Sequence, residues 1–411
     1  MEDKNIKVPE IRFKGYEEEW KNMDASIIFK TYFEKNHPDL PVLSASQEYG
    51  MIIREDVGFN VQHNKANEAG YKRVLPGQFV IHLRSFQGGF AHSTVEGITS
   101  PAYTIIEFRE KSQQDDVFWK YVLTSKVFIK RLETVTYGIR DGRSISFDDF
   151  SELGFEVPNV KEQRKIGKTL TLVDSLIHKL EQKLEKLRNI KQSLLNQIFV
   201  NVNRGGGYTP LIRFKEYDDK WTMLTLNDIS ERVTRKNTNN ESSLPLTISA
   251  QYGLVNQNDF FNSRIASKDV SGYYLIKHGE FAYNKSTSDG YPVGAVKRLD
   301  KYDIGVLSTL YIIFALNKNK MNSDFLSAFF ETDKWYEHIS QCAAEGARNH
   351  GLLNISSEDF LDLKIFAPKS KNEQALIAEY VSVLDKVVGG TSSKLAKLRS
   401  MKQSLLQKMF V

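Results

Sequence analysis

The sequence predicts an α+β protein in which one mixed α/β domain and one long helix occur twice. Three observations lead to this fold class: a repeated opening motif, a repeated closing helix, and β-branched strands between them. The 411 residues, 41% hydrophobic and 26% charged, are enough for two to three domains, each with its own core. The duplication predicts pseudo-two-fold character and two related binding sites.

Each half opens on the same short motif. Val8–Trp20 and Thr209–Trp221 share seven of 13 aligned positions, in the pattern Pro-x-Ile-Arg-Phe-Lys-x-Tyr-x-x-x-Trp. The two copies begin at Val8 and Thr209, so the repeating unit is far longer than a solenoid unit of about 20–50 residues. This spacing indicates a duplicated domain. We expect the motif to be structural, with its Ile and Phe facing inward and its Arg and Lys facing solvent.

Each half closes on a long helix with a narrow apolar stripe. Residues 162–200 align without a gap on residues 373–411, with 16 identities in 39. Apolar residues recur at spacings of three and four on an otherwise charged helix. About 38 residues rising 1.5 Å each give a helix roughly 57 Å long. A helix this long with only a narrow apolar stripe is stable when the stripe packs against a partner helix. We therefore expect the two helices to pair antiparallel as a coiled-coil spacer. Gly389-Gly390 predict a kink, or a restart of the helix at Ser392 or Ser393.

Between the motif and the helix, both halves predict the same elements in the same order. Strands are indicated by β-branched and aromatic runs, and helices by apolar periodicity. The expected strands are 78–83 and 102–106 in the first half, and 281–283 and 310–314 in the second. The expected helices are 117–131 and 323–339, followed in each half by one helical turn capped by Ser146 or Ser356.

These elements divide the chain into five parts. The expected parts are a first domain at 1–158, a spacer helix at 159–200, a linker at 201–208, a second domain at 209–368, and a second spacer helix at 369–411. The linker contains three consecutive glycines, Gly205–Gly207, and is expected to be flexible.

Composition limits the compartment and the partners. The chain has no apolar run of about 18 residues and no secretory signal at its start, so a cytoplasmic protein without a membrane span is expected. A lone cysteine, Cys342, excludes an internal disulfide, and its immediate neighbours offer no base. The net charge is +5, and segments 159–200 and 370–411 carry the basic surplus. That surplus fits a polyanionic partner, but it equally fits solvated helix faces.

No catalytic or metal-binding pattern is present. Gly167-Lys168-Thr169 lacks the glycine that a phosphate loop needs five residues earlier, because Glu162 stands there. Cysteine and histidine spacings typical of zinc are absent, as is the Asn-Pro-Pro-Tyr type of motif of adenine methylation. We therefore expect no catalytic residue, no metal and no cofactor on this chain.

Two polar, glycine-containing turns recur in each half and are the candidate binding residues. Basic and amide side chains can contact phosphates or read base edges, and glycine permits close approach of the backbone. The candidates on the first turn are Arg84, Ser85 and Gln87 in half one, and Lys285, Ser286, Thr287 and Tyr291 in half two. The candidates on the second turn are Arg140 and Arg143 in half one, and Arg348 and Asn349 in half two. The alternative is that these are ordinary hairpin tips with solvated side chains.

The ordered set of motifs resembles the specificity subunits of type I restriction-modification systems. The resemblance covers essentially the whole chain. It rests on the opening motif, on Gly279–Ser286, on Ser100–Tyr103, and on Gly-x-Arg…Ile-Ser…Asp-Phe…Pro…Glu-Gln…Ile in each half. It implies two target recognition domains separated by two antiparallel helices, each domain reading one part of a gapped DNA sequence. The first turn differs between the halves, as expected if the two domains read different sequences.

The resemblance also implies the partners. They are double-stranded DNA, two modification (methyltransferase) subunits and two restriction (translocase and nuclease) subunits. S-adenosylmethionine, magnesium and ATP would be bound by these subunits, and the present chain would not be an enzyme. Two other classes remain open: a stand-alone nuclease or methyltransferase, and an adaptor that binds proteins through its helices.

Overall fold

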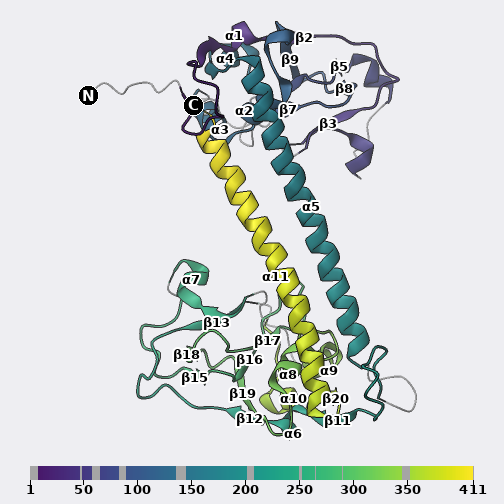
Figure 1. Ribbon diagram of the computed structural model, residues 1–411, viewed down its shortest axis with the longest axis vertical. Coiled ribbons are helices and arrows are strands. Elements are labelled where there is room, and N and C mark those ends of the chain that lie inside the picture. Colours follow the sequence, from purple (N-terminus) through teal and green to yellow (C-terminus); the bar gives the residue numbers. More distant parts are fainter. Residues whose placement is uncertain are drawn as a thin grey trace. The chain divides into compact units, whose positions relative to one another are not determined.

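A computed structural model of the chain forms two compact units (Figure 1). The structure describes residues 8–46, 49–57, 65–82, 89–135, 145–200, 208–249, 252–263, 265–288, 290–344 and 352–410. Unit 1 comprises residues 1–182 and 393–411, and unit 2 comprises residues 183–392. Each unit thus holds one globular part and a portion of each long helix.

The globular part of unit 1 is built on a four-stranded antiparallel sheet of order β2-β9-β6-β7. Its strands are β2 (Phe29–Tyr32), β9 (Thr104–Phe108), β6 (Phe79–Ile81) and β7 (Phe90–His92). Three two-stranded ladders accompany it: β1 (Lys21–Asp24) with β10 (Gly154–Val157), β3 (Leu43–Ser46) with β4 (Gly50–Ile53), and β5 (Lys72–Val74) with β8 (Gly97–Thr99). The short α-helices are α1 (Ala25–Ile28), α2 (Asp116–Leu123), α3 (Lys126–Val135) and α4 (Phe147–Ser151).

Unit 2 repeats this topology strand for strand. Its four-stranded sheet has the order β12-β19-β16-β17, with β12 (Ser230–Val233), β19 (Ile312–Leu316), β16 (Phe281–Asn284) and β17 (Ala295–Arg298). Its ladders are β11 (Thr222–Thr225) with β20 (Lys364–Ala367), β13 (Leu246–Ser249) with β14 (Gly253–Asn256), and β15 (Tyr274–Lys277) with β18 (Ile304–Leu307). Its short helices are α6 (Leu226–Ile229), α7 (Gln257–Phe261), α8 (Ser323–Phe329), α9 (Tyr336–Ala344) and α10 (Ser357–Leu361). The prediction of two similar mixed α/β domains is confirmed.

One part of the helix prediction is wrong in the same way in both units. The stretches 117–131 and 323–339 each form two helices instead of one. In unit 1 the Thr124 hydroxyl donates to the Lys120 carbonyl at 2.6 Å, and the Ser125 hydroxyl accepts from the Phe128 amide at 3.1 Å. These short side chains satisfy backbone groups locally, so one helix ends and the next begins. The single turns capped by Ser146 and Ser356 form as predicted.

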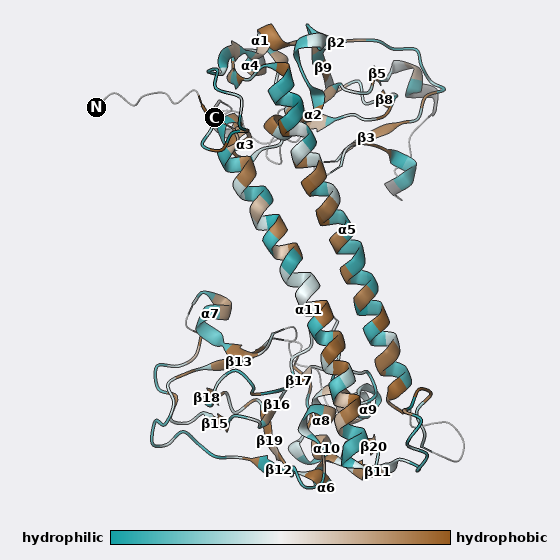
Figure 2. Ribbon diagram, in the orientation of Figure 1, coloured by the Kyte–Doolittle hydropathy of each residue, from teal (hydrophilic) through white to brown (hydrophobic). Residues whose placement is uncertain are grey.

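The long helices are α5 (Val160–Ile198) and α11 (Lys371–Lys408), and they pair within each unit. In unit 1, Asp174 of α5 pairs with Lys402 at 2.5 Å, and Glu181, further along α5, pairs with Arg399, earlier on α11. The helices therefore run antiparallel, as predicted. Figure 2 shows hydrophobic residues recurring along both helices among hydrophilic ones.

Unit 2 uses the equivalent ion pair. Lys191 of α5 contacts Asp385 of α11 at 2.5 Å. In the alignment of the two helices, Lys191 corresponds to Lys402 and Asp385 corresponds to Asp174. The same helix contact is thus made once per unit with the roles of α5 and α11 exchanged. Among the described residues, no helix is long and apolar enough to cross a membrane.

Helix α11 passes through Gly389-Gly390 without interruption, so the expected restart at Ser392 or Ser393 does not occur. A Cβ atom on either glycine would meet no heavy atom within 4 Å, so packing does not require glycine there. Replacing both with alanine is expected to stabilise the protein by about 1 kcal/mol per site, because glycine loses more backbone entropy in a helix. Urea unfolding of the full chain measures this. An unchanged or lower midpoint would mean that the helix needs the glycines.

Candidate nucleic-acid interface

The first predicted turn of unit 2 leaves the sheet at the end of β16. Ser288 and Tyr291 exchange two backbone hydrogen bonds, of 3.2 and 2.9 Å. Gly290 between them has φ +75°, in the left-handed region that glycine tolerates best. Ser286 and Thr287 are exposed at this end of the hairpin, whereas Tyr291 is half-buried and packs against the small core beneath the sheet.

Lys285 joins this turn to the segment that follows the second predicted turn. Its carbonyl accepts a hydrogen bond from the Leu353 amide at 3.0 Å, and its Nζ donates to the Ile355 carbonyl at 3.2 Å. Ser286 also forms an antiparallel bridge with Leu352. The structure therefore brings the first turn of unit 2 beside the chain that emerges from the second, a contact that the sequence did not predict.

The ammonium group of Lys285 lies in a basic environment. Burial, followed by the field of the Arg232 guanidinium, holds the pKa of Lys285 below its ordinary value. One of its three N–H groups is used on the Ile355 carbonyl, which leaves donors for a further acceptor. An anion bound here would relieve the repulsion between the two cations.

Seven of the predicted binding residues lie outside the described residues. They are Arg84, Ser85, Gln87, Arg140, Arg143, Arg348 and Asn349. In unit 1 the His82 amide donates to the Gly89 carbonyl at 2.8 Å, which extends the β6–β7 pairing toward the first turn, as the Asn284–Ala295 pair does for β16–β17 in unit 2. The scaffold on which the first turn is mounted is therefore the same in both units.

The opening motif of each half ties the globular part to its long helix. Arg12 makes a bidentate ion pair with Glu162 at 2.8 and 2.9 Å, and Arg213 makes the equivalent pair with Glu373 at 2.7 and 2.9 Å. Both carboxylates are 1% exposed. Glu162 and Glu373 correspond in the alignment of the two helices, so the contact repeats exactly where the sequence does.

This geometry corrects the expected orientation of the motif. The arginine faces inward, and Ile11 and Ile212 are 39% and 42% exposed. Phe13 and Phe214 pack against the cores, as expected. The inversion has a physical cause, because a carboxylate buried on the long helix is stable only with a cation beside it.

Glutamines next to these carboxylates hold the start of each long helix. The Gln163 side chain accepts from the Asp115 amide and donates to the Pro158 carbonyl, both at 2.9 Å. Gln374 accepts from the Asn322 amide and donates to the Pro368 carbonyl, both at 2.8 Å. Asp115 and Asn322 are the N-caps of α2 and α8, so each glutamine links a helix of the globular part to a spacer helix.

Each unit also exposes an apolar patch on its helices that the core does not use. In unit 1 the patch comprises Leu172, Leu176 and Met401, and in unit 2 it comprises Val383, Val387 and Ile190. These residues are 42–60% exposed, and each member of one patch aligns with a member of the other in the repeat. Leu376 and Tyr380 extend the patch on α11. Successive residues of an α-helix are rotated by about 100° around its axis, so these two and Val383 and Val387 fall within an arc of about 60° on one face of the helix.

Solved structures share this architecture, although no protein-family model matches the chain. The S subunit of a type I restriction-modification system from M. genitalium aligns with a TM-score of 0.57 and 14% identity, over 98% of this chain and 99% of its own. A chain from a structure of the assembly and conformational transition of a type I restriction-modification system aligns with a TM-score of 0.53 and 11% identity, over 95% and 97%.

The chain has the fold of a type I restriction-modification S subunit. The resemblance inferred from the motifs is thereby confirmed for the fold over nearly the whole chain. The S-subunit fold accounts for the two α/β parts and the two long helices together.

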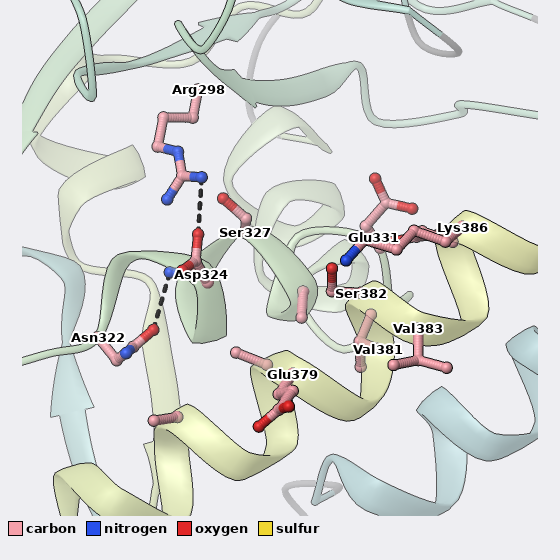
Figure 3. Close-up of a pocket in the computed structure, with 14 residues that line it drawn as sticks. Arg298, Asn322, Asp324, Ser327, Glu331, Glu379, Val381, Ser382, Val383 and Lys386 are labelled. Carbon is pink, nitrogen blue, oxygen red and sulfur yellow. Dashed lines mark hydrogen bonds and ion pairs between the residues drawn. The ribbon is translucent and has the colours of Figure 1, made fainter. Parts of the chain in front are cut away.

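A cavity of about 450 Å³ lies in unit 2 of this S-subunit fold, between α8 and α11. Figure 3 shows Arg298, Asp324 and Asn322 linked on one wall, and Val383 and Lys386 on α11. The Arg298 Nη2 contacts Asp324 at 2.7 Å, and Glu331 contacts Lys297 at 2.8 Å and Lys191 at 2.9 Å. Burial favours the protonated form of Glu331, but the two ammonium groups outweigh it and lower its pKa to about 2. Because these charges are paired with one another, they are not arranged as a general acid and a general base. The cavity adjoins the apolar patch, since Val383 belongs to both.

Cys342 has a closer partner than its sequence neighbours indicated. The His338 Nε2, one helical turn earlier, lies 3.7 Å from the Cys342 Sγ. The same Nε2 is 2.8 Å from the Asp359 carbonyl, an acceptor that requires this nitrogen to carry the proton. It therefore cannot serve as a base toward the thiol. Within the described ranges, no group of histidine, cysteine and carboxylate side chains could hold a metal ion.

Proposed function

We propose that this chain is the DNA-specificity subunit of a type I restriction-modification complex, in which each unit reads one half of a gapped target. One observation carries the proposal: two matching scaffolds present turns of different sequence. Gly279–Tyr291 of unit 2 and Gly77–Gly89 of unit 1 leave equivalent hairpins, but they carry different side chains beyond the strand. Two similar domains with different reading residues are suited to two different half-sites.

The chemistry of the turns fits base and phosphate contacts. Arginine and lysine can bind phosphates or the O6 and N7 atoms of guanine, and amides can bind adenine. In unit 2 the proposed contacts are Lys285, Ser286, Thr287, Tyr291, Arg348 and Asn349. In unit 1 they are Arg84, Ser85, Gln87, Arg140 and Arg143. The bridge between Ser286 and Leu352 supports a joint surface in unit 2, because it brings one turn beside the chain leaving the other.

The helices would dock two modification subunits, one on each apolar patch. Support comes from the repeat itself, since Leu172, Leu176 and Met401 in unit 1 are equivalent to Val383, Val387 and Ile190 in unit 2. Two equivalent surfaces on one chain fit two copies of one partner. In unit 2 the adjacent cavity could accept side chains from that partner.

Catalysis would belong to the partner subunits. S-adenosylmethionine would be bound by the modification subunits, and magnesium and ATP by the restriction subunits.

The domains proposed for base reading are residues 1–158 and 209–368, with 159–200 and 369–411 as spacer helices and 201–208 as linker.

Arginine substitutions test the role of the second turn. Arg348→Ala and Arg140→Ala, each in a complex assembled with modification subunits, are expected to weaken binding to the cognate duplex at least about tenfold, equal to about 1.4 kcal/mol. A base-reading arginine also relaxes specificity at one position, whereas a phosphate contact weakens all duplexes alike and reduces the salt slope. Wild-type binding by both variants across a salt series would remove these loops from the interface.

A further inference from the structure

A second hairpin in each unit carries the same exposed tyrosine. Tyr49 precedes β4 and Tyr252 precedes β14, each in the pattern Ser-x-x-Tyr-Gly. The Tyr49 amide donates to the Ser46 hydroxyl at 3.2 Å, and the Tyr252 amide donates to the Ser249 hydroxyl at 3.3 Å. The glycines that follow, Gly50 and Gly253, both have φ +77°. The two units thus build one turn geometry from one motif.

The rings of these tyrosines are turned outward. Tyr49 is 69% exposed and Tyr252 is 62% exposed, which places them among the most exposed large hydrophobic side chains of the described residues. A large amphipathic side chain held out at the same place in two units is a typical contact residue.

Strand pairing places Tyr49 beside β7, the strand that follows the candidate turn of unit 1. Met51 of β4 bridges Ser93, directly after β7, in parallel. A Cβ on Gly50 would lie 2.2 Å from the His92 carbonyl oxygen, which confirms the close approach of the two strands. Because β4 and β7 run in the same direction and Met51 lies opposite Ser93, Tyr49 lies level with Ala91 of β7, on the side of Gly50 that is nearer the candidate turn.

In unit 2 the corresponding strands are also neighbours, although a Cβ on Gly253 would meet no heavy atom within 4 Å. Strand β14, which follows Tyr252, contacts β17, which follows the turn at Ser288–Tyr291. Both tyrosines therefore lie beside the hairpin that carries the proposed base-reading residues of their own unit.

We propose that Tyr49 and Tyr252 contact the sugar–phosphate backbone of the DNA, and not its bases. This inference rests on the proposed function. The first turns differ between the units, as residues that read two different half-sites should. The tyrosines are identical, so they fit the feature that both half-sites share, which is the backbone. Backbone contacts set the position of a protein on the duplex and carry no sequence information directly.

The test uses the S chain assembled with modification subunits and compares cognate with non-cognate duplexes. Tyr49→Ala and Tyr252→Ala are each expected to weaken binding to both duplexes about tenfold and to leave the ratio of the two affinities unchanged. The dependence of affinity on salt should also stay the same, because tyrosine carries no charge that would release counterions. Ile27→Ala in unit 1 and Met223→Ala in unit 2 are matched controls, since they remove exposed apolar side chains from other elements.

The outcomes separate this inference from the proposed function. If the wild-type complex binds no specific duplex, the proposed function fails. If the wild-type complex binds and both tyrosine variants bind equally well, the tyrosines do not contact DNA. A changed ratio of cognate to non-cognate affinity would overturn the backbone assignment and make the tyrosines base readers. Unchanged thermal unfolding of both variants shows that any loss arises at the interface.

Discussion

Replacing Glu373 with alanine is expected to destabilise the protein by about 3–5 kcal/mol, because it leaves the Arg213 guanidinium, whose side chain is only 12% exposed, without its counterion. Glu373 is 1% exposed and accepts two hydrogen bonds from Arg213. It accepts a third hydrogen bond from the Trp221 Nε1 at 3.3 Å. The hydrogen bond to Glu373 is the main cause that raises the pKa of Arg213, and the variant loses it. The guanidinium nevertheless stays charged in the variant, because arginine is not deprotonated in proteins. Urea unfolding of the full chain measures the loss.

Two further variants control this experiment. Glu379→Ala removes an exposed carboxylate from the same helix and should change stability by less than about 0.5 kcal/mol. The double variant Arg213→Met with Glu373→Met removes both charges and should recover much of the loss, since a buried pair can often be replaced by apolar residues. If Glu373→Ala unfolds at the wild-type midpoint, the ion pair does not hold the opening motif to α11.

Charging the apolar patch on α11 is expected to prevent one of the two modification subunits from binding while the chain stays folded. Val383→Asp with Val387→Asp should weaken association with modification subunits at least about 100-fold, because a partner would have to bury two unpaired carboxylates. Leu172→Asp with Leu176→Asp should remove the equivalent site in unit 1. Each double variant alone should therefore reduce the number of bound modification subunits from two to one, measured by native mass spectrometry.

Ala396→Asp is the control, because Ala396 is exposed on the other side of α11 from the patch. It should bind two modification subunits. If the charged double variants also retain two subunits, the patches are not docking surfaces and the partners bind elsewhere.

The fold could be predicted from the sequence because its signals are local and occur twice. The apolar stripes of 162–199 and 373–410 predicted α5 and α11 within two residues at each end. The β-branched and aromatic runs occur at corresponding places in the two halves, so each strand prediction in one half supported the equivalent prediction in the other. The break between α2 and α3 was missed because Thr124 and Ser125 end and cap helices through hydrogen bonds that periodicity does not reveal.

The charged contacts could not be predicted in the same way. Periodicity assigned Arg12 and Arg213 to the solvent, whereas the buried carboxylates that hold them lie 150 and 160 residues further along the chain. The repeat contained a usable signal, because the Arg of the motif and the Glu of the long helix occur in both halves. The exposed tyrosines Tyr49 and Tyr252 were missed for a different reason: their hairpins became recognisable as equivalent only through their shared register.

Mapping of methylated adenines in cells that carry this chain with its modification subunits tests the central claim most directly. We expect one gapped, two-part sequence motif. Exchanging residues 209–368 for those of a related S chain should change one half of that motif and leave the other half and the gap length as they were. A continuous motif, or a change in both halves after the exchange, would contradict the assignment of one half-site to each unit.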